Sequence, residues 1–559
     1  MKKIIIPIMF VLALSVGCTK NFEEINTSET TLTENVIQPQ YVFEPVLYYI
    51  HGSSHQRNFD LYDYHYAHYT GELGIADVGR YEYRDDWGGV YWRNFYTSRL
   101  QEYWLIRKCC EREGESFNAF QAANDIWNVY AWTILVNRWG DVPYLDAEGK
   151  FNAGNGTVLP YTSQKDIYLD LLARLKADSD ILSNTSNQGM IDPAYDILYK
   201  GDYEKWRKFA NTLIMRLSMR LSRTDCAETA KTYFVAAVPL AMDSPSDYAR
   251  ISCDSSTAGD YLDVTSCDWA EVRPDEYFMK LMNGDNPGYT TGVVDPRRAI
   301  WFHEGTDPVN PNPTTYYTDG LATNWDGFPD GTYTLGSVAT VSSDHGGANS
   351  FALLNYADKN GFWWFNNHNT NNENLSFCIA TYSETLFLRA EAALRGWYSG
   401  DAQTLYRQAI KASMDEICFF ITRSGGTATI SDAEFETYYA ALPAFGTSKE
   451  AQFRSIMIQK WIALFPNAQE AWSEIRRTGY PEVGVVSYPI LSPNAQVQDG
   501  NLIQRMSYPD NEYNYNVANI PADYQKGGSK YTYRGQYGLY WSQAGEGNTL
   551  SKDTQPNNF

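Results

Sequence analysis

Positive charge is scarce in this sequence. Its 559 residues include 45 lysines and arginines against 67 aspartates and glutamates, which gives a formal net charge of −22 at pH 7. A surface of that sign repels phosphate backbones and anionic lipids. The composition therefore predicts neither nucleic acid nor an anionic lipid surface as a partner.

The patterns that mark common metal, redox and catalytic sites are also missing. Eight cysteines without a CxxC pair or regular spacing predict no disulfide framework, although one bridge between Cys253 and Cys267 stays open. Seven histidines are scattered, and the four at 51–68 have no evident ligand partners. There is no GxSxG, HExxH or phosphate loop. The sequence thus predicts a protein that is not an enzyme, with a carboxylate pair of glycosidase type as a minor alternative.

Long apolar runs are confined to the start of the chain. Lys2 and Lys3 precede an uncharged run of 13 residues, Ile4–Val16. That is the length of a signal-peptide core and short of the roughly 20 residues that span a membrane. Leu-Ser-Val-Gly-Cys, ending at Cys18, resembles the lipobox of bacterial lipoproteins. We therefore predict a signal peptide at 1–17 and acyl chains on Cys18, which would anchor the protein stably; an ordinary secretion signal is the alternative.

Much of the chain shows the apolar periodicity of helices. Apolar residues recur at helical spacing in six segments, at 92–104, 119–134, 167–175, 206–217, 379–393 and 453–464. The second is followed by Gly140 and Pro143, a standard helix stop. By contrast, residues 241–374 and 481–559 are rich in Gly, Asn, Asp, Pro and aromatics and show no such period. This predicts a mainly α fold, with tetratricopeptide-type helix pairs packed against a large loop-rich region and little β structure.

Several motifs along the chain carry a family resemblance. They are NFEEINT (21–27), RWGDVPY (138–144), DYEKWRKFANTLIMRLSMRLS (202–222), DPR (295–297), TYSETLFLRAEAALRGW (381–397), IMIQKWIALFPNAQEAWSEIRRTGYP (456–481) and RMSYPDNEYNYN (505–516). Together, and in this order, they resemble the SusD/RagB family of Bacteroidetes outer-membrane lipoproteins. The resemblance implies one SusD-like domain over 18–559, with a helical scaffold at about 41–240 and 375–480, a loop-rich insert at about 241–374 and a loop-rich tail at 481–559.

The resemblance also implies a role and a location. Such proteins sit at the cell surface, anchored in the outer membrane, and cap a SusC-like TonB-dependent barrel to which they deliver nutrients. The usual cargo is a glycan, whereas RagB-type members are associated with peptides. A pure repeat scaffold is a further alternative, but it would not need long aromatic-rich loops.

The motif residues themselves are expected to be structural rather than ligand-binding. Helical positions of this kind bury an apolar face and pair their charges. The residues concerned are Trp206, Asn211, Arg216, Glu384, Glu391, Trp472 and Arg476. The motifs thus identify a family without marking its binding site.

Three aromatic stretches outside the helical pattern are the candidate binding surface. They are YEYRDDWGGVYW at 81–92, TYYTDGLATNWDGFPDG at 315–331 and NYADKNGFWWFNNHN at 355–369. A sugar ring packs its C–H face on a flat aromatic side chain, and its hydroxyls need polar donors and acceptors beside it. The predicted ligand residues are Tyr83, Arg84, Trp87, Tyr317, Asn324, Trp325, Asp326, Trp363 and Trp364. Packing between loops and helices is the competing explanation for the tryptophans.

No cofactor is predicted. Asp326 and Asp330, next to glycines, suggest a calcium loop, but the full EF-hand spacing is absent. A few stacked rings and hydrogen bonds suit binding in the millimolar to micromolar range, about −4 to −8 kcal/mol. Weak binding of this kind suits a protein that hands its cargo on.

Overall fold

The structure is a computed structural model that describes residues 37–52, 54–72, 76–145, 147, 158–186, 188–189, 191–253, 272–303, 353–354, 375–423, 428–482, 492–528 and 531–559. Helices dominate these residues, which confirms the predicted mainly α fold. Most of the loop-rich insert predicted at 241–374 lies outside them.

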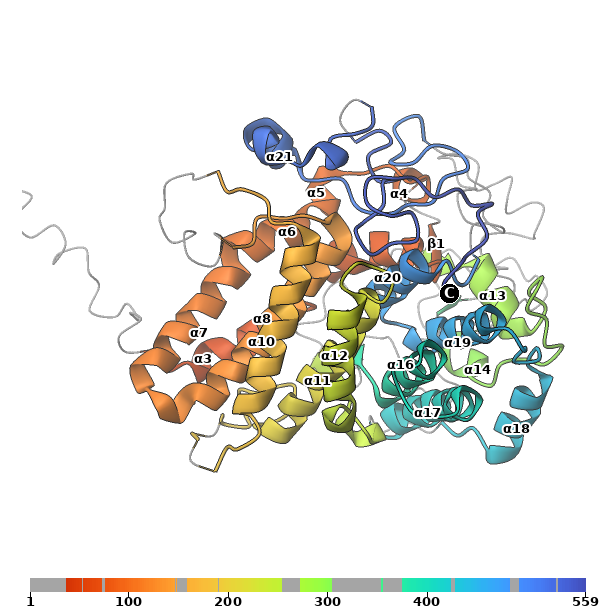
Figure 1. The fold of residues 1–559 in the computed structure, drawn as a ribbon, viewed down its shortest axis with the longest axis horizontal. Helices are drawn as coiled ribbons and strands as arrows, with labels where there is room; N and C mark the ends of the chain where they lie inside the picture. Colours follow the sequence, from red (N-terminus) through yellow and green to blue (C-terminus); the bar gives the residue numbers. More distant parts are fainter. Residues whose placement is uncertain are drawn as a thin grey trace, which may run out of the picture.

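The first half of the chain forms a row of antiparallel helices (Figure 1). The elements are α3 (Gln40–Tyr49), the π-helix η1 (Gln56–Tyr64), α4 (Ala76–Gly79), α5 (Asp85–Gly88), α6 (Val90–Asn94), η2 (Phe95–Arg99), α7 (Leu100–Glu113), α8 (Asn118–Trp139), α10 (Gln164–Ile181), α11 (Tyr203–Arg220) and α12 (Ala227–Ala237). Consecutive long helices from α7 to α12 pack against one another, as tetratricopeptide-type pairs do. The helix expected at 92–104 is real but interrupted, because η2 inserts a stretch of π-helix between α6 and α7.

The second half adds a smaller helical group. It comprises α13 (Glu276–Asn283), α14 (Arg298–Trp301), α16 (Tyr382–Arg395), α17 (Ala402–Arg423), α18 (Asp432–Ala441), α19 (Lys449–Leu464), α20 (Ala468–Thr478) and α21 (Asp510–Tyr515). The helix α16 packs on α17, α19 and α11, and α20 packs on η1. The two halves therefore meet along α11 and η1.

The helices begin and end where their capping residues dictate. Asp202 caps α11 by accepting the N–H groups of Glu204 and Lys205. Thr381 caps α16 by accepting the N–H of Glu384, so Ile379, expected in that helix, instead belongs to a strand. At the other end of a helix, Gly140 follows α8 with a φ of 92°, which only glycine adopts without strain.

The strands are short and come in pairs. In the described residues they make three two-stranded antiparallel sheets. The pairs are β1 (Thr70–Glu72) with β3 (Val272–Pro274), β2 (Ala249–Cys253) with β6 (Leu375–Ala380), and β4 (Phe302–His303) with β5 (Leu353–Leu354). The first two pairs connect the middle of the chain to its two helical halves. The expectation of little β structure is confirmed.

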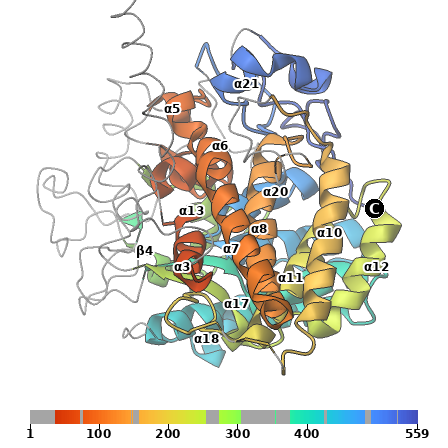
Figure 2. The ribbon, with the colours of Figure 1, turned by 90° about the vertical axis from the view of Figure 1, so that its left-hand side faces the viewer.

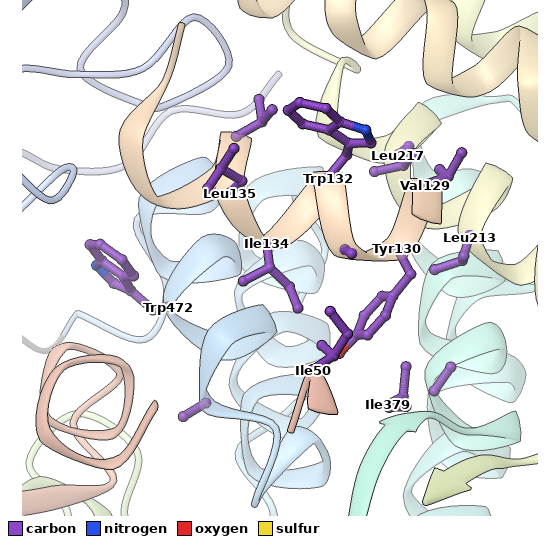
Figure 3. Packing of buried hydrophobic residues seen from close by; sticks show 14 of the residues in the cluster. Ile50, Val129, Tyr130, Trp132, Ile134, Leu135, Leu213, Leu217, Ile379 and Trp472 are labelled. Atoms are coloured by element: carbon purple, nitrogen blue, oxygen red, sulfur yellow. The ribbon is translucent and has the colours of Figure 1, made fainter. Parts of the chain in front are cut away.

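The core lies around α8. Tyr130, Ile134 and other side chains of this helix point to several neighbouring elements, and Leu213 and Leu217 of α11 and Trp472 of α20 close around them (Figure 3). Twenty of the 22 residues of α8 are buried, so the helix is enclosed on all sides.

Buried charges join the helices, and the motif residues supply most of them. Arg216 of α11 makes a bidentate pair with Glu384 of α16, at 2.6 and 2.7 Å. Arg477 of α20 does the same with Glu391 of α16, at 2.7 Å twice. These four side chains are at most 4% exposed. Because breaking a buried pair leaves an uncompensated charge, the network fixes how α11, α16 and α20 meet.

The remaining motif residues are also structural. Trp206 is fully buried and donates its indole N–H to Asp196. Asn211 donates to Ser179, and Arg476 stacks 3.5 Å from the ring centroid of Trp472. The expectation that these motifs build the scaffold is confirmed.

The tail after residue 491 crosses back over the first half. The indole N–H of Trp139 donates to the carbonyl of Ser507, and the N–H of Met506 donates to the carbonyl of Arg138. The RWGDVPY and RMSYPDNEYNYN motifs therefore meet in space, although more than 360 residues separate them.

Candidate functional site

The described part of the predicted site is the short helix α5 and the residue before it. Arg84 has extended backbone at the position before α5, and Trp87 lies in the helix. The guanidinium of Arg84 lies over the indole of Trp87, 3.5 Å from the ring centroid. The structure thus brings two of the predicted ligand residues together as a stacked pair.

Hydrogen bonds fix the backbone on which this stacked pair is mounted. The N–H of Arg84 donates to the hydroxyl of Tyr62 in the π-helix, at 3.1 Å, and that hydroxyl is 3.4 Å from the carbonyl of Arg84. Arg93 of α6 binds the carboxylate and the carbonyl of Asp85, each at 3.0 Å. A four-residue helix has little stability of its own, so these contacts are what fix its geometry.

The two side chains are partly accessible. Trp87 is half-buried and packs against the core. The side chain of Arg84 is 37% exposed, and its contact with Asp86 is long, at 3.7 Å. The arrangement offers part of an indole ring beside guanidinium N–H groups, which can donate to hydroxyl or carbonyl oxygens of a ligand.

Tyr83, predicted to contact the ligand with them, is instead a core residue. It is 3% exposed and packs edge-on against Tyr531 with ring centroids 4.6 Å apart. Burial raises the pKa of its hydroxyl well above the ordinary value. The predicted contact does not fit Tyr83, because its ring is packed in the core against Tyr62 and Tyr531.

The other predicted residues lie outside the described part of the chain. They are Cys18, Tyr317, Asn324, Trp325, Asp326, Asp330, Trp363 and Trp364, together with Cys267 of the disulfide that was left open. The ligand roles of Arg84 and Trp87, and of this group, stay predictions.

The sequence did not single out the segment that adjoins α5. The backbone N–H of Asp510, the first residue of α21, donates to the carboxylate of Asp85 at 2.9 Å. Tyr531 donates its hydroxyl to the carboxylate of Asp510. The only sequence signal was the motif at 505–516, which identified the family but not this contact.

The histidines near residue 51 are structural in the geometry that is described. His51 is 2.7 Å from the hydroxyl of Tyr130, and burial lowers its pKa well below the ordinary value, so it is neutral. His55 lies 3.2 Å from Asp60. No group of three potential metal ligands occurs in the residues that the structure describes.

Five cysteines in the described segments, at 109, 110, 226, 378 and 418, are free thiols. A search of the helices in those same segments finds none that is both long and apolar enough to cross a membrane.

Paired helices packed around buried hydrophobic clusters, with a stacked arginine–tryptophan pair at one end, define a helical fold of tetratricopeptide type. The family model described as "Starch-binding associating with outer membrane" (SusD-like) matches residues 29–509, and the chain belongs to this SusD-like family. Members of the family are non-catalytic carbohydrate-binding proteins of the outer membrane, in agreement with the prediction of a binder. A search of curated proteins gives no match.

Solved structures have the same fold. A chitin-binding protein is 24% identical with a TM-score of 0.70, over 90% of this chain and 100% of its own. A chitin-binding SusD homologue from Flavobacterium johnsoniae is 23% identical with a TM-score of 0.66, over 90% and 98%. A SusD-like protein from Bacteroides thetaiotaomicron is 22% identical with a TM-score of 0.67, over 92% and 100%.

Proposed function

We propose that this protein is a cell-surface lipoprotein, anchored through Cys18, that captures glycans and delivers them to a SusC-like TonB-dependent barrel. The family match over residues 29–509 is the observation that carries the proposal. The signal peptide predicted at 1–17 and the lipobox-like stretch that ends at Cys18 support the anchor. An anchored binding protein with no pore of its own needs a transporter, which supports the barrel as its partner.

Arg84 and Trp87 are proposed as one contact of the glycan site. The exposed part of the indole would pack on the C–H face of a sugar, and the guanidinium would bind its hydroxyls. Two of the solved relatives are chitin-binding proteins, so oligosaccharides of N-acetylglucosamine are the first ligands to try. Peptide capture of the RagB type is the alternative, and it would depend less on exposed ring stacking.

The test is Trp87→Ala with calorimetric binding measurements on the soluble protein. We expect affinity for the bound oligosaccharide to fall on the order of tenfold, since one stacked contact with its buried area is worth about 1.4 kcal/mol. The melting temperature should change by only a few degrees, because Trp87 is half-buried.

The chain offers a matched control. Trp104 of α7 is also half-buried, and Arg107 lies over its ring at 4.9 Å. Trp104→Ala should leave binding unchanged. Equal binding by the wild type and Trp87→Ala would contradict the proposed contact, and binding of peptides but of no oligosaccharide would favour the RagB-type alternative.

A further inference from the structure

Tyr515 has an unusual position for a large side chain. It is 77% exposed, more than any other large hydrophobic residue that the structure describes. Asn511 and Asn514, on the same short helix, are also exposed. A bare tyrosine ring beside amide groups combines a flat apolar face with hydrogen-bond donors and acceptors.

The segment that carries Tyr515 is rigidly mounted. The carboxylate of Glu512 accepts hydrogen bonds from Tyr161 at 2.7 Å and from the amide of Asn516 at 2.8 Å. Asn516, which is 7% exposed, also donates to the carbonyl of Leu159. The backbone that carries Tyr515 is therefore fixed, so a ligand that stacks on the ring has to order only the two side-chain torsions of one tyrosine.

Tyr515 and Trp87 lie at the same end of the molecule. Figures 1 and 2 both place α5 and α21 there, and the hydrogen bond from Asp510 to Asp85 joins the two helices directly. From its contact with Asp85, α21 extends five residue steps of 1.5 Å, about 8 Å along its axis, to Tyr515. A ligand held at Trp87 must extend along this helix to reach Tyr515, which calls for an oligosaccharide rather than a single sugar.

The charge of the intervening surface limits the ligand. Asp86 is 67% exposed on the α5 side, and Asp510 is partly exposed where α21 begins. Arg84 and Arg93 pair with Asp86 and Asp85, but the carboxylates of Asp510 and Glu512 leave this surface with a net negative charge, which repels a polyanionic chain. The surface therefore favours uncharged glycans over acidic ones.

We propose that Tyr515 is a second aromatic contact in the binding site, reached only by linear, uncharged oligosaccharides long enough to extend from Trp87 along α21. This inference rests on the proposed function, because it assumes that a glycan is held at Trp87. Tyr515, at the end of the short helix α21, then increases the affinity for long ligands but not for short ones.

The experiment compares Tyr515→Ala with the wild type on linear oligosaccharides of N-acetylglucosamine, glucose and xylose, from two to six units long. For the series that binds, the wild type should gain affinity with length. The Tyr515→Ala variant should bind the shortest oligomers normally and lose about three- to tenfold on the longest. Trp87→Ala should weaken binding at every length.

Two controls separate ring stacking from loss of structure. Tyr515→Phe keeps the ring and should bind as the wild type does. Tyr41→Ala removes another exposed tyrosine, 51% exposed on α3 and away from α21, and should have no effect. All three tyrosine variants should melt at the wild-type temperature.

The outcomes distinguish this inference from the proposed function. If Trp87→Ala weakens binding while Tyr515→Ala binds every length normally, the role of Tyr515 is wrong and the proposed function stands. If the wild type binds none of the three series at millimolar concentration, the proposed function and the inference both fall.

Discussion

Glu416 of α17 is a buried acid that no buried arginine neutralises in the contacts described. It is 3% exposed, and its carboxylate accepts the N–H of Ser383 in the first turn of α16, at 2.9 Å. Burial raises its pKa from 4.5 to about 7, although the hydrogen bonds from Ser383 and Tyr382 oppose the rise. The residue thus binds its proton more tightly in the folded protein than in the unfolded chain.

The raised pKa of Glu416 makes the free energy of unfolding depend on pH. Below pH 4.5 the carboxyl is protonated in both states, and its contribution is fully present. As the pH rises toward 7, the unfolded chain loses the proton first, so the folded state loses about 3 kcal/mol relative to it. We expect Glu416→Gln to lose less stability than the wild type between pH 5 and 7, as measured by denaturant unfolding.

An acidic residue at the surface serves as the control for Glu416→Gln. Glu436 of α18 pairs with Arg407 and is exposed, so Glu436→Gln should keep the wild-type slope of stability against pH. If the slope of stability against pH in Glu416→Gln also equals that of the wild type, Glu416 does not titrate in this range.

At the scale of elements, α21 depends on one carboxylate for its position. Glu512 binds both Tyr161, which precedes α10, and Asn516, at the end of α21. Its removal leaves two donors without their acceptor, at a cost of about 1–3 kcal/mol where they are buried. The helix has only six residues, so it cannot keep its shape without such contacts.

We therefore expect Glu512→Ala to speed amide hydrogen exchange at residues 510–519 while α8 and α11 stay protected. Binding of the longest oligosaccharides should weaken although Tyr515 is intact. Glu512→Gln retains one acceptor oxygen and should recover part of the protection. Unchanged exchange in Glu512→Ala would mean that other contacts hold this segment.

The elements were largely predictable from local patterns, and their interruptions were not. The periodicity around Ala119 and Ile134, closed by Gly140, located α8 correctly. The π-helix η2 was missed because its apolar residues keep an approximately helical period. Ile379 was assigned to a helix because nothing in the sequence showed that its segment, β6, pairs with β2 more than 120 residues earlier.

At the scale of the whole molecule, the site was only partly predictable. Arg84 and Trp87, both named from the sequence as ligand candidates, lie beside each other because they are three residues apart, and their ligand role stays a prediction. The sequence could not show that residues 510 and 531 complete their surroundings, because no local pattern encodes contacts across more than 400 residues. Tyr83 had the right composition for a ligand contact, but its direction depended on that distant packing.

The anchor can be tested on the intact protein in its own cells. Cys18→Ala should abolish incorporation of a palmitate label, because no other residue replaces the lipidated thiol. Without the acyl chains, the protein should remain on membranes only through the barrel and should be released when the barrel is deleted. Full labelling of the variant would contradict the lipoprotein assignment.

The return of the tail over the first half has a consequence for how the protein matures. Trp139, Arg138 and Asp85 each bind a residue between 506 and 510, so early helices complete their contacts only with the last part of the chain. Contacts so distant in sequence slow folding, because the intervening loop must close first. Residues of the first half therefore cannot complete their packing until the residues near 510 have joined them.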